Sequence, residues 1–203
     1  MTAQPSTEDI ALEAIRAEAE ALSFHPRGTV RCGGMPLFRT QLARDFGCLL
    51  DIDPDVEEWS CLPLVLRSGG RTHVPDFLVA GGQGAWLMDA PETAPEPWVQ
   101  EAACREGFRY GWKSADDIRA GTRLANARDL LRYARWSCPL GDRVRLLAAL
   151  DENGSIPVAE CLTAFRETNP IAGLSSLVLH RFVEVDLDEA RIGPETLVRR
   201  CRG

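Results

Sequence analysis

Two aspartates stand where carboxylates could share a divalent metal ion. Asp76 lies in the segment VPDFLV and Asp89 ends the segment AWLMD, and both segments are apolar enough to form neighbouring strands. The glycine-rich GGQG between them predicts a turn that brings the two carboxylates close together. Paired carboxylates are typical Mg²⁺ ligands in enzymes that hydrolyse phosphodiesters. An aspartate directly after a proline is more often a turn or cap residue, so the pattern alone leaves both interpretations open.

The elements predicted around these aspartates form an α/β arrangement. Residues 36–50 have apolar side chains at helical spacing, and the following DIDPDVEEW is expected to turn the chain out of the helix. Strands are predicted over residues 62–67, 71–79 and 85–89. Ser68-Gly69-Gly70 is the turn between the first two strands, and Pro75 is expected to create an edge or a bulge. The pattern therefore predicts a helix followed by a three-strand meander with acids at strand ends.

The chain after about residue 112 has a different pattern. Helices are predicted over residues 118–136, 142–150, 159–166 and 171–181, and short strands over residues 155–158, 182–187 and 196–198. Asn153-Gly154 is expected to end the second helix, and Asn169 to cap the fourth with Pro170 at its first position. Three short helices followed by a β-hairpin are the order of a winged-helix domain.

Three parts of the chain follow from these patterns. Residues 1–23 are expected to be an N-terminal helix, capped by Ser6 or Thr7, and residues 24–112 the α/β domain. The Pro-rich APETAPEPW within the α/β domain is predicted to be a loop. Residues 113–203 are expected to be the mainly helical domain.

Charge is distributed unevenly along the chain. The formal net charge is −7, yet residues 105–145 hold ten basic and five acidic residues. Four arginines of this region are candidate DNA contacts on the predicted long helix: Arg123, Arg128, Arg132 and Arg135. A local basic patch is sufficient for DNA binding in an acidic protein, although solvated helix faces also carry such charges.

The remaining composition indicates a cytoplasmic protein. The seven cysteines include no C-x-x-C pair, so reduced thiols in the core are favoured over a zinc site or disulfides. No run of about 18 apolar residues is present, so no membrane span is expected. The acidic N-terminal segment lacks the basic and apolar regions of a secretory signal.

Three segments in this order resemble the TnsA-type transposon endonucleases. They are RTQLARDFGCLLDIDPDV, THVPDFLV and WLMDAP, and together they cover about residues 36–91. The later segments RDLLRYAR, GSIPVAECL and LVLHRFVEVDL resemble the second domain of the same family more loosely. The resemblance implies a restriction-endonuclease-like mixed sheet flanked by helices, followed by a winged-helix-like domain that contacts a transposase partner. It also implies Mg²⁺ on Asp76 and Asp89.

The sequence departs from this family at two catalytic positions. Ala43 stands where the resemblance implies a glutamate, and Pro91 stands where it implies a lysine. The single lysine of the chain, Lys113, lies outside the motif. Losing one electrostatic catalytic group costs roughly two to three orders of magnitude in rate, and a lost metal ligand adds to that loss.

Neighbouring residues could replace the lost groups. Gln41 or Asp45 would stand in for the glutamate, and His73 or Arg71 for the lysine. Gln41 and Asp45 each lie two residues from Ala43 and so point to other helix faces, while His73 would face away from Asp76 on a regular strand. Loss of the site is therefore favoured over substitution.

Three functions remain open at this point. The favoured one is a TnsA-like pseudoenzyme of a mobile element that binds DNA ends or a transposase partner. The second is an active Mg²⁺-dependent endonuclease that cuts at transposon ends. The third is a protein-interaction module without DNA binding. A solvent-facing arginine stripe would favour DNA binding, and arginines paired with acids of the first domain would favour the interaction module.

Overall fold

The computed structural model describes residues 7–201, and it divides the chain into two compact units. The first unit contains the described residues up to His25 together with Arg31–Arg119, and the second contains Pro26–Val30 and the described residues from Ala120 onward. The division thus falls later than residue 112, and the N-terminal helix belongs to the first unit. The predicted cap at Ser6 lies outside the described residues.

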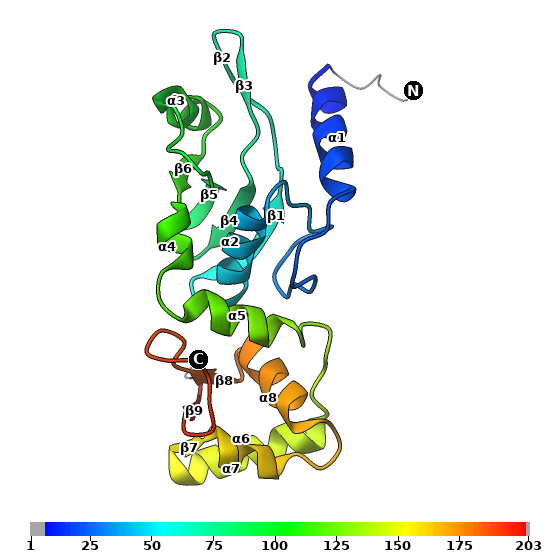
Figure 1. Cartoon of the computed structure of the whole chain (residues 1–203), viewed down its shortest axis with the longest axis vertical. Coiled ribbons are helices and arrows are strands. Elements are labelled where there is room, and N and C mark those ends of the chain that lie inside the picture. Colours follow the sequence, from blue (N-terminus) through cyan, green and yellow to red (C-terminus); the bar gives the residue numbers. More distant parts are fainter. Residues whose placement is uncertain (1–6, 202–203) are drawn as a thin grey trace. The chain divides into compact units, whose positions relative to one another are not determined.

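A four-stranded mixed sheet forms the centre of the first unit (Figure 1). Its strands are β1 (Val56–Cys61), β4 (Phe77–Gly81), β5 (Gly84–Asp89) and β6 (Arg109–Trp112), in the order β1-β4-β5-β6. The first three are antiparallel neighbours, and β6 runs parallel to β5. A parallel pair needs a crossover connection, which helix α3 (Pro97–Arg105) provides.

Helix α2 (Gln41–Ile52) packs on this sheet through an aromatic cluster. The ring of Phe46 meets that of Phe77 edge-on at 5.6 Å, and Trp59 of β1 meets Phe77 at 5.5 Å. Thr40 caps the helix by accepting a hydrogen bond from the N–H of Ala43. Two further helices complete the unit: α1 (Thr7–Glu20) and α4 (Ala115–Arg119).

A small hairpin stands apart from the main sheet. It consists of β2 (Leu66–Ser68) and β3 (Arg71–His73), which pair only with each other. Gly69 and Gly70 form its turn with φ of 56° and 79°, values that glycine adopts without a steric penalty. The glycine turn is confirmed, but the predicted continuous strand over residues 71–79 is wrong. The chain leaves β3 at His73, and Pro75 separates it from β4.

Other predicted elements of the first unit also need correction. The segment DIDPDVEEW was expected to be a turn, yet its second half forms strand β1, with Val56 and Trp59 buried. The predicted helix over residues 36–50 begins only at Gln41, and the predicted strand over residues 62–67 reduces to β2. Helix α3 and strand β6 were not predicted, because Pro97 and the acids before it resemble a continuing loop.

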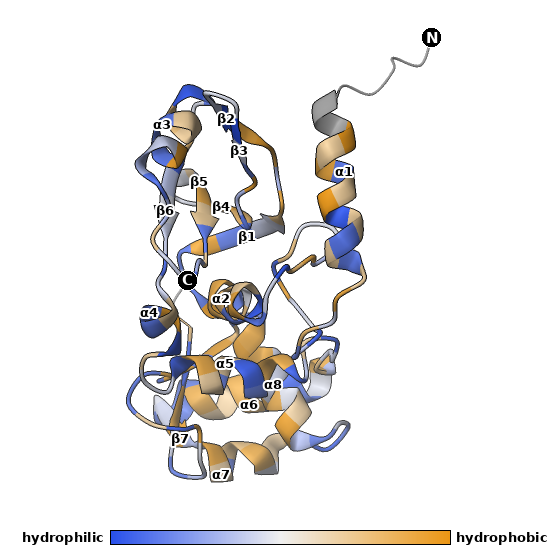
Figure 2. Cartoon of the chain, turned by 45° about the horizontal axis from the view of Figure 1, so that its top comes forward, coloured by the Kyte–Doolittle hydropathy of each residue, from blue (hydrophilic) through white to orange (hydrophobic). Residues whose placement is uncertain are grey.

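The second unit combines helices with a three-stranded sheet. Its elements are α5 (Arg123–Leu131), α6 (Leu140–Asn153), β7 (Ser155–Pro157), α7 (Val158–Cys161), the 3₁₀ turn η1 (Leu162–Ala164), α8 (Pro170–Leu179), β8 (Val183–Val185) and β9 (Leu197–Arg200). The sheet is antiparallel with the order β7-β9-β8. Apolar residues concentrate on α6 and α8 (Figure 2), and their side chains fill one core with β7, β8 and β9.

Several predicted boundaries in the second unit are confirmed. Gly154, with φ of 74°, ends α6, and the side chain of Asn169 caps α8 with Pro170 at the first position. The single long helix over residues 118–136 is wrong. Gly121, with φ of 61°, separates α4 from α5, and α5 ends at Leu131. In residues 7–201, no helix is both long enough and apolar enough to cross a bilayer.

Candidate active site

Asp76 and Asp89 lie side by side in the first unit. Asp76 directly precedes β4 and Asp89 is the last residue of β5, its antiparallel neighbour. The backbone N–H of Asp76 donates to Oδ1 of Asp89 at 2.7 Å, and the N–H of Ala90 donates to Oδ2 of Asp76 at 3.0 Å. The structure therefore brings together the two aspartates that the sequence pattern selected as metal ligands.

Arg39 supplies a positive charge to Asp76. It stands immediately before Thr40, at the start of α2. Its Nη2 and Nε atoms donate to Oδ1 of Asp76 at 2.5 and 3.2 Å, and Nη2 also donates to the carbonyl oxygen of Val74 at 2.8 Å. Because a guanidinium is permanently charged and carries several donors, it can stabilise a buried carboxylate without a metal ion.

His73 and Tyr110 hold the second carboxylate. Nε2 of His73 lies 2.6 Å from Oδ2 of Asp89, and the hydroxyl of Tyr110 donates to the same oxygen at 2.5 Å. His73 comes from the end of β3 and Tyr110 from β6, so the two reach Asp89 from different elements. The imidazole also stands edge-on to the Trp98 ring, with a centroid distance of 6.5 Å. These contacts fix the orientation of the Asp89 carboxylate.

All four carboxylate oxygens of the pair accept hydrogen bonds from the protein. Asp76 and Asp89 are 8% and 2% exposed, so little of either reaches solvent. A metal ion at this position would compete with Arg39 for Oδ1 of Asp76 and with His73 and Tyr110 for Oδ2 of Asp89. In the part of the chain that the structure describes, no group of three or more His, Cys, Asp and Glu side chains is placed to hold a metal. The residues present do not fit Mg²⁺, which requires near-octahedral oxygen coordination.

The two carboxyl groups have opposite pKa shifts. Burial raises the pKa of Asp76, although Arg39 opposes the shift. Burial acts in the same direction on Asp89, but the hydrogen bonds from His73 and Tyr110 outweigh it and lower the pKa. Burial and the nearby Asp89 charge raise the pKa of Tyr110, which keeps this hydroxyl a neutral donor. Asp89 is therefore the member of the pair that ionises first.

Ala43 and Pro91 are the two positions at which the chain departs from the pattern that the resemblance implies. Ala43 is 1% exposed and lies one helical turn before Phe46, whose ring packs on Phe77, the residue after Asp76. A methyl group on this face of α2 offers no ligand. Pro91 follows Ala90, whose N–H contacts Asp76, and a proline supplies neither a charge nor a donor.

Most of the residues that could have replaced the missing glutamate and lysine contact other side chains in the structure. Nε2 of Gln41 donates to Oδ1 of Asp45 at 2.7 Å along α2. Arg71 pairs with Glu96 at 2.8 Å and stacks over the Trp98 ring. These contacts occupy the side chains that would have to rebuild the lost glutamate and lysine.

Lys113 follows β6 and comes near Asp89 only through the backbone. Its N–H donates to the carbonyl oxygen of Asp89 at 3.0 Å. Hydrogen bonds from Ser114 lower the pKa of Asp117, and the charge of Lys113 adds to this effect.

His73 is the exception among the substitutes. The sequence placed it on the strand face opposite Asp76 for a regular strand, and the structure has it in contact with Asp89 instead. The premise of a regular strand from residue 71 to 79 is wrong, because the chain is not in a strand between His73 and Phe77. His73 therefore reaches Asp89. We call the two aspartates, together with the Arg39, His73 and Tyr110 side chains that contact their oxygens, the closed carboxylate pair.

Sequence reasoning missed two residues of the site. Arg39 has no motif around it and contacts Asp76 only because the chain folds back before α2. Tyr110 lies on β6, a strand that was not predicted. The alternation in FRYGW was the available signal for this strand, and the strand itself is only four residues long.

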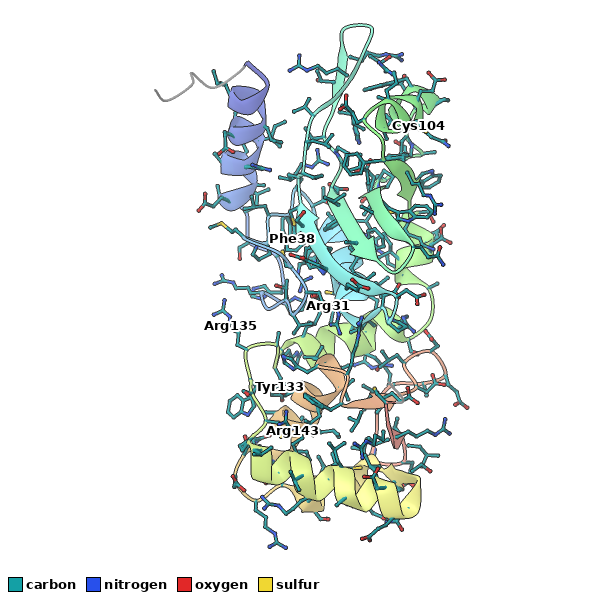
Figure 3. All side chains as sticks on the ribbon, turned by 180° about the vertical axis from the view of Figure 1, so that it is seen from behind. Arg31, Phe38, Cys104, Tyr133, Arg135 and Arg143 are labelled. Atoms are coloured by element: carbon teal, nitrogen blue, oxygen red, sulfur yellow. The ribbon has the colours of Figure 1, made fainter. Side chains whose placement is uncertain are left out.

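The four arginines selected as DNA contacts do not form one helical stripe. Arg123 pairs with Asp188 at 2.7 Å, and Arg132 lies 3.7 Å from Asp129, so their partners belong to the second unit itself. Arg128 is half-buried. Arg135 is exposed on the connection between α5 and α6 (Figure 3). The end of α5 at Leu131 separates Arg132 and Arg135 from the helix face that carries Arg123.

Helix α8 precedes the predicted β-hairpin, which is the position of the DNA-reading helix in a winged-helix domain, yet it is largely buried. Residues 172–177 are all buried, and within the second unit α8 packs against α5, η1 and β8. Ser175 and Ser176, two polar residues of this helix, are 6% and 3% exposed. This helix therefore has little surface with which to read a base sequence.

Compared with protein-family models and with curated proteins, the chain has no match.

Proposed function

We propose that this chain is a TnsA-like protein of a mobile element, with a restriction-endonuclease-like first unit that has lost its metal centre. Its role is to bind DNA ends or a transposase partner instead of cutting DNA. The observation that carries the proposal is that the side chains of Arg39 and His73 contact the carboxylate oxygens of Asp76 and Asp89, where a metal ion would otherwise bind.

The order of elements in the first unit supports this assignment. Helix α2 is followed by the antiparallel strands β1, β4 and β5, then by helix α3 and the parallel strand β6. This order places the Asp76 and Asp89 segments at adjacent strand ends, which is the arrangement the resemblance implies. The absence of a glutamate at Ala43 and of a lysine at Pro91 agrees with a scaffold that is kept without its chemistry.

The second unit supports a binding role. Its order of helix, strand, two helices and two strands, with the sheet order β7-β9-β8, resembles a winged helix. Because α8 is buried, we assign the DNA backbone contact to the exposed Arg132 and Arg135. Such contacts are independent of base sequence and depend strongly on salt. The pairing of Arg123 with Asp188 in its own unit gives no support to an interaction module without DNA.

A nicking assay tests the proposal. Supercoiled plasmid is incubated with Mg²⁺ or Mn²⁺ and either the wild type or Asp76→Ala, with EDTA as the background. We expect neither protein to nick above that background. Nicking by the wild type that disappears in Asp76→Ala would overturn the proposal. It would establish the alternative, an active Mg²⁺ endonuclease in which His73 takes part in a rebuilt site.

A further inference from the structure

The connection after α5 in the second unit interleaves arginines with aromatic residues. Its residues 132–136 have the sequence RYARW, and we call them the RYARW segment. The N–H groups of Tyr133, Ala134 and Trp136 each donate to a carbonyl oxygen three residues earlier, so the segment is a series of tight turns. Ala134 also packs closely on Gly28, where an added Cβ would lie 2.7 Å from its side chain. These contacts hold the backbone of the segment in one conformation.

Trp136 is fixed by one edge while its ring stays open to solvent. Its Nε1 donates to the hydroxyl of Thr168 at 2.7 Å, yet the residue is 45% exposed. The acceptor is itself held in place, because the N–H of Thr168 donates to the buried carboxylate of Asp142 at 3.0 Å. A side chain that is already positioned loses little conformational freedom when a ligand binds. The indole is therefore a preformed flat surface.

Exposed guanidinium groups accompany this ring. The side chain of Arg132 is 73% exposed, and that of Arg135 extends away from the ribbon (Figure 3). Within residues 7–201, Arg135 has no hydrogen bond or ion pair, and Arg132 has only the 3.7 Å contact with Asp129. Arg27, the neighbour of Gly28, adds a third exposed arginine to the same part of the unit. The guanidinium groups are thus available to an anionic partner.

Two acids adjoin the RYARW segment, and both are paired. Asp129 forms an ion pair with Arg191 as well as its longer contact with Arg132. Glu167 precedes Thr168 and pairs with Arg145 at 2.8 Å. The acids therefore do not cancel the charge of Arg135, and the surroundings of the exposed ring favour a polyanion.

An exposed ring with arginines on either side matches the chemistry of a nucleic-acid strand. Phosphates recur at every nucleotide and bind guanidinium groups, and a base stacks on an aromatic ring irrespective of its sequence. In a duplex the faces of the bases are covered by their neighbours, so only an unpaired base offers a face to an indole. The ring therefore selects for single strands, whereas the arginines alone would bind both forms.

We propose that the RYARW segment binds unpaired nucleotides, with one base stacked on Trp136 and the phosphates on Arg132 and Arg135. The inference rests on the proposed function, in which the same two arginines contact the DNA backbone, and it adds single-stranded nucleic acid as the substrate class.

Fluorescence anisotropy in EDTA at low salt tests the stacking. A labelled oligo-dT strand and a labelled duplex of equal length are titrated with the full-length wild type, Trp136→Leu and the control Trp112→Leu. Leucine keeps apolar bulk but has no ring, and Trp112 is about as exposed as Trp136, at 43%. Trp136→Leu should weaken single-strand binding roughly tenfold, the effect of one lost base stack. Its duplex affinity should match the wild type, and Trp112→Leu should change neither affinity.

Tryptophan fluorescence provides a second test that keeps a ring at this position. Stacking of a base on an indole quenches its emission, so oligo-dT should quench the wild type. Trp136→Phe, which retains an aromatic face, should keep most of the single-strand affinity but lose most of this quenching. Quenching of equal size in the wild type and Trp136→Phe contradicts the proposal.

The outcomes separate this inference from the proposed function. If the wild type binds duplex and single strand, and Trp136→Leu changes neither affinity, the stacking is overturned while the backbone contact stands. If the wild type binds neither form, the DNA contact of the proposed function fails as well, and the exposed ring is left as a surface for a protein. Because EDTA removes metal throughout, both results are independent of the nicking assay.

Discussion

Both units contain buried aspartates, and the groups that donate hydrogen bonds to these aspartates differ between the two units. In the second unit, Asp142 is fully buried and accepts hydrogen bonds from the N–H groups of Arg166, Glu167 and Thr168. Arg145, three residues along α6, pairs with it as well. All its backbone donors thus come from one short loop, so this carboxylate fixes that loop against α6.

The Asp76–Asp89 pair has another kind of environment. Its side-chain donors, Arg39, His73 and Tyr110, come from three separate segments of the first unit. Arg39 and His73 remain about one-third exposed. Arg145 is exposed to the same degree as Arg39, so the contrast lies in the origin of the donors. One loop supplies the backbone donors of Asp142, whereas side chains from three separate segments converge on Asp76 and Asp89.

The largest expected effect is the loss of folding stability when the buried Asp142 of the second unit is replaced. Asp142→Ala leaves three N–H groups of the loop without their acceptor, which should cost about 2–4 kcal/mol of unfolding free energy. Urea unfolding followed by tryptophan fluorescence is a suitable measurement, because Nε1 of Trp136 donates to Thr168 at 2.7 Å in the same loop. Asp186→Ala is the matched control, because Asp186 also accepts two backbone N–H groups but is exposed, so water can replace it. Equal stability of Asp142→Ala and the wild type would refute the structural role.

A second prediction compares arginines. Arg39 is committed to Asp76, whereas Arg132 and Arg135 are exposed. Arg132→Ala with Arg135→Ala should weaken DNA binding roughly tenfold and reduce its salt dependence, since each phosphate contact contributes about one unit of slope. Arg123→Ala, which removes a guanidinium already paired with Asp188, is the control. Gel-shift titrations over a salt series that give one affinity for all three proteins would exclude DNA contact at this position.

The smallest expected effect concerns the pH dependence of stability. Asp142 and Asp89 have lowered pKa values, so their contributions are present above pH 4 and are lost as the pH falls through the folded-state values. Asp76 has a raised pKa, so its contribution is present at low pH and is lost as the pH rises from about 4. Urea unfolding of Asp142→Asn and Asp76→Asn from acid to neutral pH should give opposite slopes relative to the wild type. Parallel slopes would contradict the assigned shifts.

The sequence predicted those features that depend on local chemistry. The glycine turns at residues 69–70 and 81–84, the Asn169 cap and the Gly154 helix end are all encoded by neighbouring residues, and the structure contains each of them. The convergence of Asp76 and Asp89 followed from the same reasoning, because a tight hairpin connects their strands.

Features that depend on distant contacts could not be predicted. The contact of Arg39 with Asp76 spans 37 residues, and that of Tyr110 with Asp89 spans 21. The burial of α8 depends on its packing against α5, and this packing could not be predicted from the residues of α8 alone. Gly121 interrupts an otherwise helical pattern, and its positive φ in the structure shows that the chain is not helical at this residue.

The central claim is that Arg39 and His73 close the carboxylate pair to metal, and Mn²⁺ binding tests it most directly. Calorimetric titration of the wild type should show no saturable binding. The variant Ala43→Glu with Arg39→Ala, which adds a carboxylate and removes the competing guanidinium, should gain a Mn²⁺ site that depends on Asp76. If the wild type instead binds Mn²⁺ and Asp76→Ala abolishes that binding, the pair is a metal centre and the account is wrong.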